Sequence, residues 1–165
     1  MGFDLHGMNP ETSTPEPTWK KGDPWITEGN RRYLDPKIEK EYRKHMDAVI
    51  EWQDNSEGAY FRSNIWFWRP LWSYVCSVCE FITDKDMNEG FMNNGHTIAK
   101  TKSKRIASRL RKLFNRGDVH DYNDYYKHKQ SKLNDNDWNK NYPFDVKHVL
   151  QFANFCEKSG GFQIW

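Results

Sequence analysis

Residues 71–82 limit the possible folds more than any other part of the chain, because nine of the twelve are apolar. Two apolar stripes recur there at helical spacing: Leu71, Val75, Val78 and Ile82, and beside them Trp72, Cys76 and Cys79. Pro70 suits the first helical position, where its missing N–H removes no hydrogen bond. A helix that is apolar on most sides must be buried. The sequence therefore predicts a buried central helix at about residues 70–82.

The chain of 165 residues is long enough for one domain with a real core. Phe, Trp and Tyr make up 16% of it, although the chain as a whole is hydrophilic. Large rings should therefore provide much of the buried surface. The formal net charge is only +2, so any affinity for nucleic acid must come from how the charge is distributed.

Local signals predict several further elements. Alternating apolar residues predict a short strand in residues 1–10, and residues 60–62 are a second strand candidate. Residues 10–34 hold four of the seven prolines, which indicates a loop or extended arm packed on the surface rather than a regular element. Asp35, as a cap before Pro36, predicts a helix that ends near Trp52.

The second half of the chain carries clearer helix boundaries. Thr101 is the predicted cap of a helix that ends before Gly117. Asp145 is the predicted cap of a last helix, which ends before Gly160. The polar, Tyr- and Lys-rich residues between them favour a solvent-facing segment with weak helix potential, and the last four residues can form a strand. The predicted fold is a single, mostly helical α+β domain over 1–165, with three or so further helices and a few short strands.

Three cysteines, with no N-terminal hydrophobic segment, favour a reducing compartment. No window approaches the length of a membrane span, so no membrane association is predicted. We expect a cytoplasmic protein.

Four blocks of sequence resemble an uncharacterised family of small proteins that is common in tailed-bacteriophage genomes. The blocks are "MGFDLHGMNP", "YFRSNIWFWRPLWSYVC", the turn before "HTIAK", and "PFDVKHVLQFANFCEKSGGFQIW". The resemblance implies a phage or prophage setting in the host cytoplasm and transfers no catalytic residue. Residues 10–34, the helix after them and the basic residues 100–116 are the least similar parts.

Cys76 and Cys79 have the spacing of half a zinc site. His96, Cys156 or His6 could supply further ligands, but none forms a second pair. Because the two thiols lie in the middle of the predicted central helix, packing as small apolar side chains is the favoured interpretation. No metal or other cofactor is predicted.

Asp4 and His6 lie two residues apart on a predicted strand and therefore face one side. With His96 they could form a polar pocket for acid–base chemistry, or they could be ordinary strand-edge residues. No nucleophile with an evident base and no phosphate-binding motif is present. The sequence gives no support for an enzyme.

A basic stripe follows one flank of the predicted 101–116 helix: Lys102, Arg105, Arg109, Lys112 and Arg116. Tyr122, Tyr125 and Tyr126 come soon after it. Cations that neutralise phosphates beside rings that stack on bases are typical of nucleic-acid or nucleotide binding. A solvated helix face is the alternative.

The stretch before Pro70 carries a second candidate ligand site, formed by Arg62, Trp66, Phe67, Trp68 and Arg69. On an extended segment Trp66 and Trp68 would face one side and Phe67 the other, so at least one ring should lie in a cleft or an interface. Core packing is the alternative for most of these rings.

The leading functional hypothesis is a non-enzymatic accessory protein that binds an anionic ligand, either nucleic acid or a small nucleotide. The alternative is a module that binds a host or virion protein, possibly as a homo-oligomer. The third is a zinc-stabilised fold or small metalloenzyme.

Overall fold

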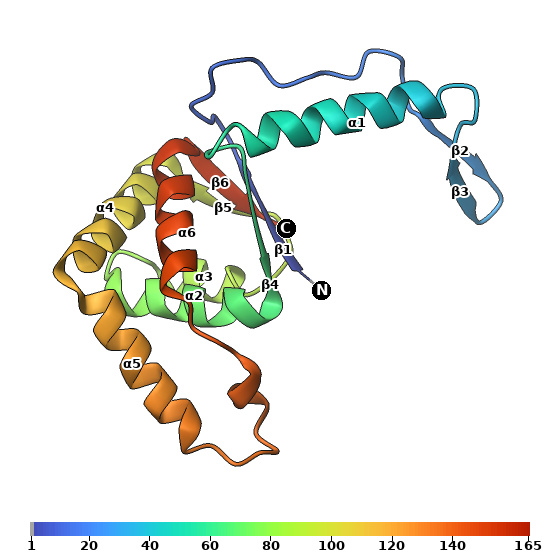
Figure 1. Cartoon of the computed structure of the whole chain (residues 1–165). Helices are drawn as coiled ribbons and strands as arrows, with labels where there is room; N and C mark the ends of the chain where they lie inside the picture. The colour runs from blue at the N-terminus through green and yellow to red at the C-terminus, as the bar shows by residue number, and fades with distance from the viewer. Residues whose placement is uncertain (1) are drawn as a thin grey trace. The chain divides into compact units, whose positions relative to one another are not determined.

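The computed structural model describes residues 2–165, which divide into two compact units. One unit contains residues 2–11 with Glu57–Trp165, and the other contains Thr12–Ser56. The described residues form six α-helices, one 3-10 helix and six short strands, so the predicted mostly helical α+β class is confirmed (Figure 1). The predicted packing of residues 10–34 on the surface of a single domain stays a prediction.

A four-stranded antiparallel sheet organises the larger unit. Its strand order is β4 (Tyr60–Asn64), β1 (Gly2–Gly7), β6 (Gly161–Ile164) and β5 (His96–Ala99). The strands predicted near both chain ends and at residues 60–62 are therefore confirmed. Because side chains alternate along a strand, this register places one row of apolar side chains on a single face of the sheet.

That face is covered by helices and forms the aromatic core. Phe3 stacks on Trp68 of α2 (Ile65–Val78) with ring centroids 5.4 Å apart. Phe61 lies 5.4 Å from Phe152 of α6 (Val146–Lys158), and Phe162 lies 5.8 Å from the same ring. All five rings are buried. The expectation that large rings form the core is confirmed.

Helix α2 is the buried central helix, but it begins five residues earlier than the sequence predicts and ends at Val78, four residues before the predicted end. The side chain of Asn64 accepts a hydrogen bond from the N–H of Phe67 and caps the helix, so Pro70 lies inside it. Residues 66–69 are helical rather than extended, and Trp66 and Trp68 do not share a face. Trp68 is completely buried, whereas Trp66 is 37% exposed. The cap at Asn64 and the burial of Trp68 outweigh the preference of the residue before a proline for an extended backbone.

The remaining helices of the larger unit are α3 (Asp84–Glu89), α4 (Lys100–Arg116), α5 (Asp118–Ser131) and the 3-10 helix η1 (Trp138–Asn141). The predicted end of α4 at Gly117 and the cap of α6 by Asp145 are confirmed. The predicted cap of α4 by Thr101 is wrong, because the helix begins at Lys100 with Ala99 at its N-cap. Residues 118–131 form a helix in spite of their weak helix potential, so the interpretation of this stretch as a solvent-facing segment is wrong. Val119 is fully buried and Tyr122 packs on Tyr74 at 4.5 Å, so tertiary contacts stabilise α5.

The smaller unit contains β2 (Trp25–Glu28), β3 (Arg31–Leu34) and α1 (Glu39–Asp54). Residues 10–34 are therefore not free of regular structure, because β2 and β3 form a hairpin. Gly29, with φ +57°, provides the positive φ that a two-residue hairpin turn requires. Helix α1 begins later than predicted, since the Asp35 carboxylate caps a turn at Lys37 instead.

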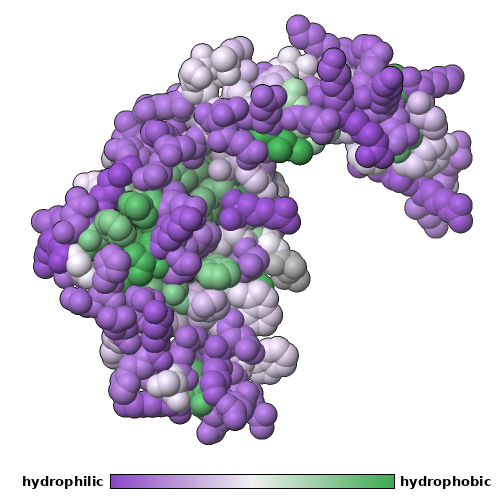
Figure 2. Space-filling view, viewed as in Figure 1, coloured by the Kyte–Doolittle hydropathy of each residue, from purple (hydrophilic) through white to green (hydrophobic). Residues whose placement is uncertain are grey.

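The surface in Figure 2 is largely hydrophilic, with hydrophobic residues visible between α4 and α6 and a small hydrophobic patch on α1. Among residues 2–165 no helix is both long and apolar enough to cross a membrane.

Candidate functional site

The aromatic cleft is an open cavity of about 360 Å³ beside the N-terminal half of α2. Its lining residues come from four separate parts of the larger unit: Arg69, Pro70 and Ser73 of α2, Phe91, Tyr126 of α5, and Asn139 and Tyr142 at the 3-10 helix. The cleft therefore joins Arg69 of the predicted aromatic site with Tyr126 of the tyrosine-rich segment.

Tyr142 is held in place from several sides. Its ring lies 4.9 Å from that of Trp66, and its backbone carbonyl accepts hydrogen bonds from the Tyr126 hydroxyl at 2.8 Å and the Gln130 side chain at 2.7 Å. Burial raises the pKa of Tyr126, so this hydroxyl remains a donor at neutral pH. These contacts fix the position of the wall that the two tyrosines form.

Arg69 supplies the positive charge of the aromatic cleft. Its guanidinium lies 5.6 Å from the centroid of the Tyr142 ring, and Nη1 lies 3.3 Å from the Tyr142 hydroxyl. Among residues 2–165 no carboxylate forms an ion pair with it. An exposed guanidinium that is fixed by a ring but not neutralised is suited to an anion.

A second cavity, the serine–histidine cleft, has a volume of about 260 Å³ and lies where β4 passes into α2. Its lining residues are Arg62, Ser63, Asn64, Phe67, Asp145, Lys147, His148 and Gln151. The Ser63 hydroxyl lies 2.9 Å from Nε2 of His148. Burial lowers the pKa of His148 below its usual value. Arg62 and Phe67, both predicted ligand residues, therefore lie in a different cleft from Arg69.

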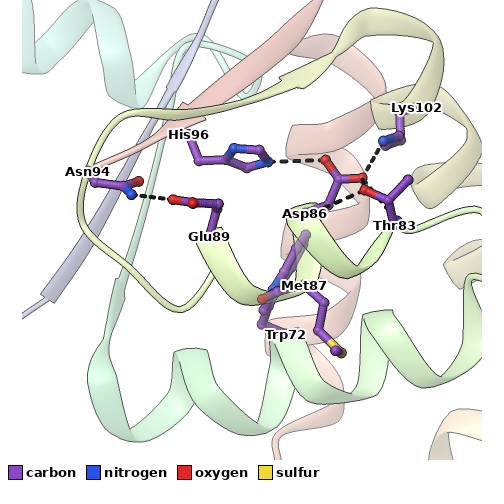
Figure 3. A network of polar contacts seen from close by, with 8 residues as sticks. All are labelled: Trp72, Thr83, Asp86, Met87, Glu89, Asn94, His96 and Lys102. Carbon is purple, nitrogen blue, oxygen red and sulfur yellow. Dashed lines mark hydrogen bonds and ion pairs between the residues drawn. The ribbon is translucent and has the colours of Figure 1, made fainter.

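A buried carboxylate network connects α3, β5 and α4 (Figure 3). Asp86 is 5% exposed and accepts hydrogen bonds from Lys102, from Nε2 of His96 at 3.1 Å, and from the hydroxyl of Thr83 at 2.6 Å. Burial acts to raise the pKa of Asp86, but the hydrogen bonds from Lys102, Thr83 and His96 outweigh it and hold the pKa well below the usual range. Every bond of this network is internal, which indicates a structural role.

The predicted polar pocket is not assembled. Asp4 and His6 do face one side of the sheet, where Asp4 accepts a hydrogen bond from Tyr60 and His6 packs on the Tyr60 ring at 5.2 Å. His96 pairs with Ile164, which pairs with the buried Leu5, so His96 lies on the opposite face. Alternation along β1 thus separates Asp4 and His6 from His96.

Most of the basic stripe on α4 is engaged inside the protein. Lys102 binds Asp86, Arg105 lies 3.9 Å over the ring of Phe81, and Arg109 donates to the carbonyl of Val78 at 2.9 Å. Arg116 forms an ion pair with Asp118 at 3.1 Å. Lys112 is exposed and has no ion pair within residues 2–165.

The three tyrosines of α5 lie near one another, with the Tyr122 ring 6.2 Å from that of Tyr125 and 6.0 Å from that of Tyr126, but they have different surroundings. Tyr122 packs against Tyr74 and Phe144, Tyr126 lines the aromatic cleft, and Tyr125 is 60% exposed. Only Tyr126 therefore lies beside a predicted cation, Arg69.

Cys76 and Cys79 lie at the end of α2, and burial raises the pKa of both thiols to about 12. They are therefore protonated at neutral pH. Within residues 2–165 no group of three or more His, Cys, Asp or Glu side chains is placed to hold a metal ion.

Sequence reasoning missed Tyr142, the Ser63–His148 pair and Asp86. Ser63 and His148 are 85 positions apart, so no local pattern joins them. Asp86 did have a local signal, since a threonine followed three residues later by an acidic residue is the pattern of a capping box, and that box is formed.

Comparisons of the chain with protein-family models, with curated proteins and with solved structures gave no match. The resemblance to a phage family therefore stays a prediction.

Proposed function

We propose that this protein binds an anionic ligand that carries an aromatic group, such as a nucleotide or a base of single-stranded nucleic acid, in the aromatic cleft. The observation that carries the proposal is Arg69, which is exposed, fixed against Tyr142 and not neutralised by a carboxylate within residues 2–165. The proposal keeps the sequence-based hypothesis of an anionic ligand but moves its centre from the basic stripe of α4 to this cleft.

The size and lining of the cleft support this ligand class. A volume of about 360 Å³ lies within the range of small-molecule sites, near its lower end. The rings of Phe91, Tyr126 and Tyr142 provide faces on which a base can stack. Arg69 can bind phosphate, while Ser73 and Asn139 add neutral polar groups at the wall.

Replacement of Arg69 by alanine should weaken binding of such a ligand by roughly ten- to a hundredfold, because it removes a charge-assisted contact worth about 1.5–3 kcal/mol. The measurement is calorimetric titration at low salt with a nucleotide panel, short single-stranded DNA and RNA. The affinity of the wild type should fall steeply as salt is added.

Lys112→Ala is the matched control, since this exposed lysine lies on the basic stripe and outside the aromatic cleft. It should bind as the wild type does. Equal losses in both variants would place the ligand on α4 instead, and no binding by the folded wild type would refute the proposal.

The smaller unit favours a second candidate function, the binding of another protein chain. Within residues 12–56, all of which the structure describes, no hydrophobic side chain is buried. Instead Trp25, Tyr33, Met46 and Ile50 are between 37% and 52% exposed. A two-stranded hairpin with one helix has too little core to be stable alone.

The exposed side chains of this unit match those of protein interfaces. Trp25, Tyr42, Arg43 and Met46 line one cavity of about 480 Å³, together with Leu34 and Asp47. Tyr, Trp, Met and Arg are enriched where proteins bind one another. The hydrophobic patch on α1 is visible in Figure 2.

If this surface binds a second copy, light scattering should give a mass above 19.8 kDa that falls on dilution. The double variant Met46→Glu, Ile50→Glu should be monomeric, because two buried charges would enter the interface. A wild type that stays monomeric and retains no phage or host protein in a pull-down would exclude this function.

A further inference from the structure

We propose that Ser63 and His148 form a catalytic pair that hydrolyses small esters bearing a negative charge. This inference is independent of ligand binding at the aromatic cleft, because it rests on a different cavity, the serine–histidine cleft. The pair brings a nucleophile and a base together at hydrogen-bond distance, 2.9 Å from Oγ to Nε2, in a cavity of about 260 Å³.

The backbone places Ser63 at a junction suited to a nucleophile. Strand β4 ends at Asn64 and α2 begins at Ile65, so no loop separates Ser63 from the start of the helix. The residue as a whole is 2% exposed, and it contributes to the cleft wall. A substrate would therefore reach its hydroxyl from the cleft alone.

His148 has the surroundings of a general base. Its ring lies 5.0 Å from Phe61 and 5.7 Å from Phe67, which limits its contact with water. Burial keeps its pKa below the usual value, although a hydrogen bond with Gln151 and the charge of Asp145 oppose this shift. At neutral pH the imidazole is therefore uncharged and can accept a proton.

The hydroxyl of Ser63 has two acceptors. Oγ lies 3.3 Å from the carbonyl of Asn64 and 2.9 Å from Nε2 of His148. The reactive arrangement is the one in which the proton is shared with the nearer acceptor, the imidazole.

The same cleft offers positive charge. Arg62 and Lys147 line it, together with one carboxylate, Asp145, which accepts the N–H of His148 as the cap of α6. Arg62 also forms an ion pair with Asp4 at 3.6 Å, whereas Lys147 forms none within residues 2–165. These two cations can stabilise an oxyanion and favour an anionic substituent on the substrate.

The reaction balances with water alone. Ser63 Oγ forms a bond to the ester carbonyl carbon while its proton passes to Nε2 of His148. The bond from that carbon to the alcohol oxygen then breaks, and His148 returns the proton to the departing alcohol. Water, deprotonated by His148, next attacks the acyl-serine, releases the carboxylic acid and restores the Ser63 hydroxyl.

The test is labelling of the folded full-length chain with a fluorophosphonate, with the adduct located by peptide mass analysis. We expect one adduct, on Ser63, and none in Ser63→Ala. In His148→Gln, which keeps a polar side chain but lacks the base, labelling should be about 10²–10⁴-fold slower. Ser108→Ala, which changes an exposed serine of α4 that lines neither cleft, is the control and should be labelled as the wild type is.

Circular dichroism should first establish that each variant is folded. If Ser63→Ala fails to fold, the mapped adduct in the wild type and the rate in folded His148→Gln still decide the question. No adduct on Ser63, or equal rates in the wild type and His148→Gln, would overturn the proposal.

Substrate charge gives a second readout. The protein should hydrolyse mono-p-nitrophenyl succinate in preference to p-nitrophenyl acetate, and Arg62→Ala combined with Lys147→Ala should abolish that preference while acetate hydrolysis continues. An equal preference in the double variant would refute the anionic substrate class.

Discussion

Replacing Asp86 with alanine should destabilise the protein by about 3–5 kcal/mol, the usual consequence of removing one partner from a buried ion pair. The change leaves Lys102, His96 and Thr83 without their shared acceptor and also removes the capping box of α3 (Figure 3). Because these partners belong to different elements, the loss should appear in global unfolding. Urea denaturation followed by circular dichroism measures it.

Asp84→Ala is the matched control, because Asp84 is an exposed acidic residue in the first turn of the same helix. It should cost less than about 1 kcal/mol, the worth of a carboxylate at a helix N-terminus. Equal losses for Asp84→Ala and Asp86→Ala would show that the buried network contributes nothing of its own.

The stability that Asp86 contributes to the folded protein should also depend on pH. The folded protein holds the pKa of Asp86 below its usual value, so the unfolded chain binds this proton more readily. The stabilisation is fully present above a pH of about 4 and is lost as the pH falls through the folded pKa. The difference in stability between the wild type and Asp86→Ala should therefore shrink only in acid.

Replacing Trp68 with alanine should cost about 3–5 kcal/mol through the cavity that it leaves. Trp68 is fully buried, stacks between Phe3 and Trp72 with centroids 5.4 Å from each, and donates its indole N–H to the carbonyl of Gly90 at 2.8 Å. Since whole domains are stable by only about 5–15 kcal/mol, this loss should lower the urea midpoint strongly.

Two further variants separate the contributions of Trp68. Trp68→Phe keeps most of the ring but leaves the Gly90 carbonyl without its donor, so it should cost about 1–3 kcal/mol. Trp138→Ala removes a tryptophan that is 73% exposed and should change stability by less than about 0.5 kcal/mol. If Trp68→Ala is no more destabilising than Trp138→Ala, the packing described for the core is wrong.

The parts of the fold that could be predicted have local causes. Gly117 adopts a φ of +90° that only glycine accepts readily, and it ends α4 where the sequence predicts. Asp145 caps α6 through its own side chain, three residues before the N–H that it binds. Alternation of Phe3 and Leu5 with polar neighbours likewise marks β1, whose burial follows the same period.

The features that escaped prediction depend on contacts between distant residues. Pro70 suggests a helix start, but the cap at Asn64 and the burial of Trp68 extend α2 past it. Residues 118–131 have weak helix propensity by themselves and are held by Tyr74 and Phe144. The clefts could not be predicted for the same reason, since their residues are far apart in the sequence: Arg69 and Tyr142, for example, are 73 positions apart.

The basic stripe illustrates why composition alone does not show which cations are free to bind a ligand. Its residues do share a flank of α4, as the spacing predicts, yet Lys102, Arg105 and Arg109 are each occupied by an internal partner. Arg69, one cation of the aromatic stretch, keeps an unneutralised charge beside stacking rings. Burial and pairing, which the sequence does not contain, decide which of these cations can meet a ligand.

The most direct test of the central claim is a nuclear magnetic resonance titration of the isotope-labelled chain with nucleotides and short single-stranded DNA at low salt. Binding in the aromatic cleft predicts that the largest shifts fall on the amides of Arg69, Ser73, Tyr126 and Tyr142 and that they disappear in Arg69→Ala. Shifts centred on Lys112 and the exposed flank of α4, or none at all, would contradict the account.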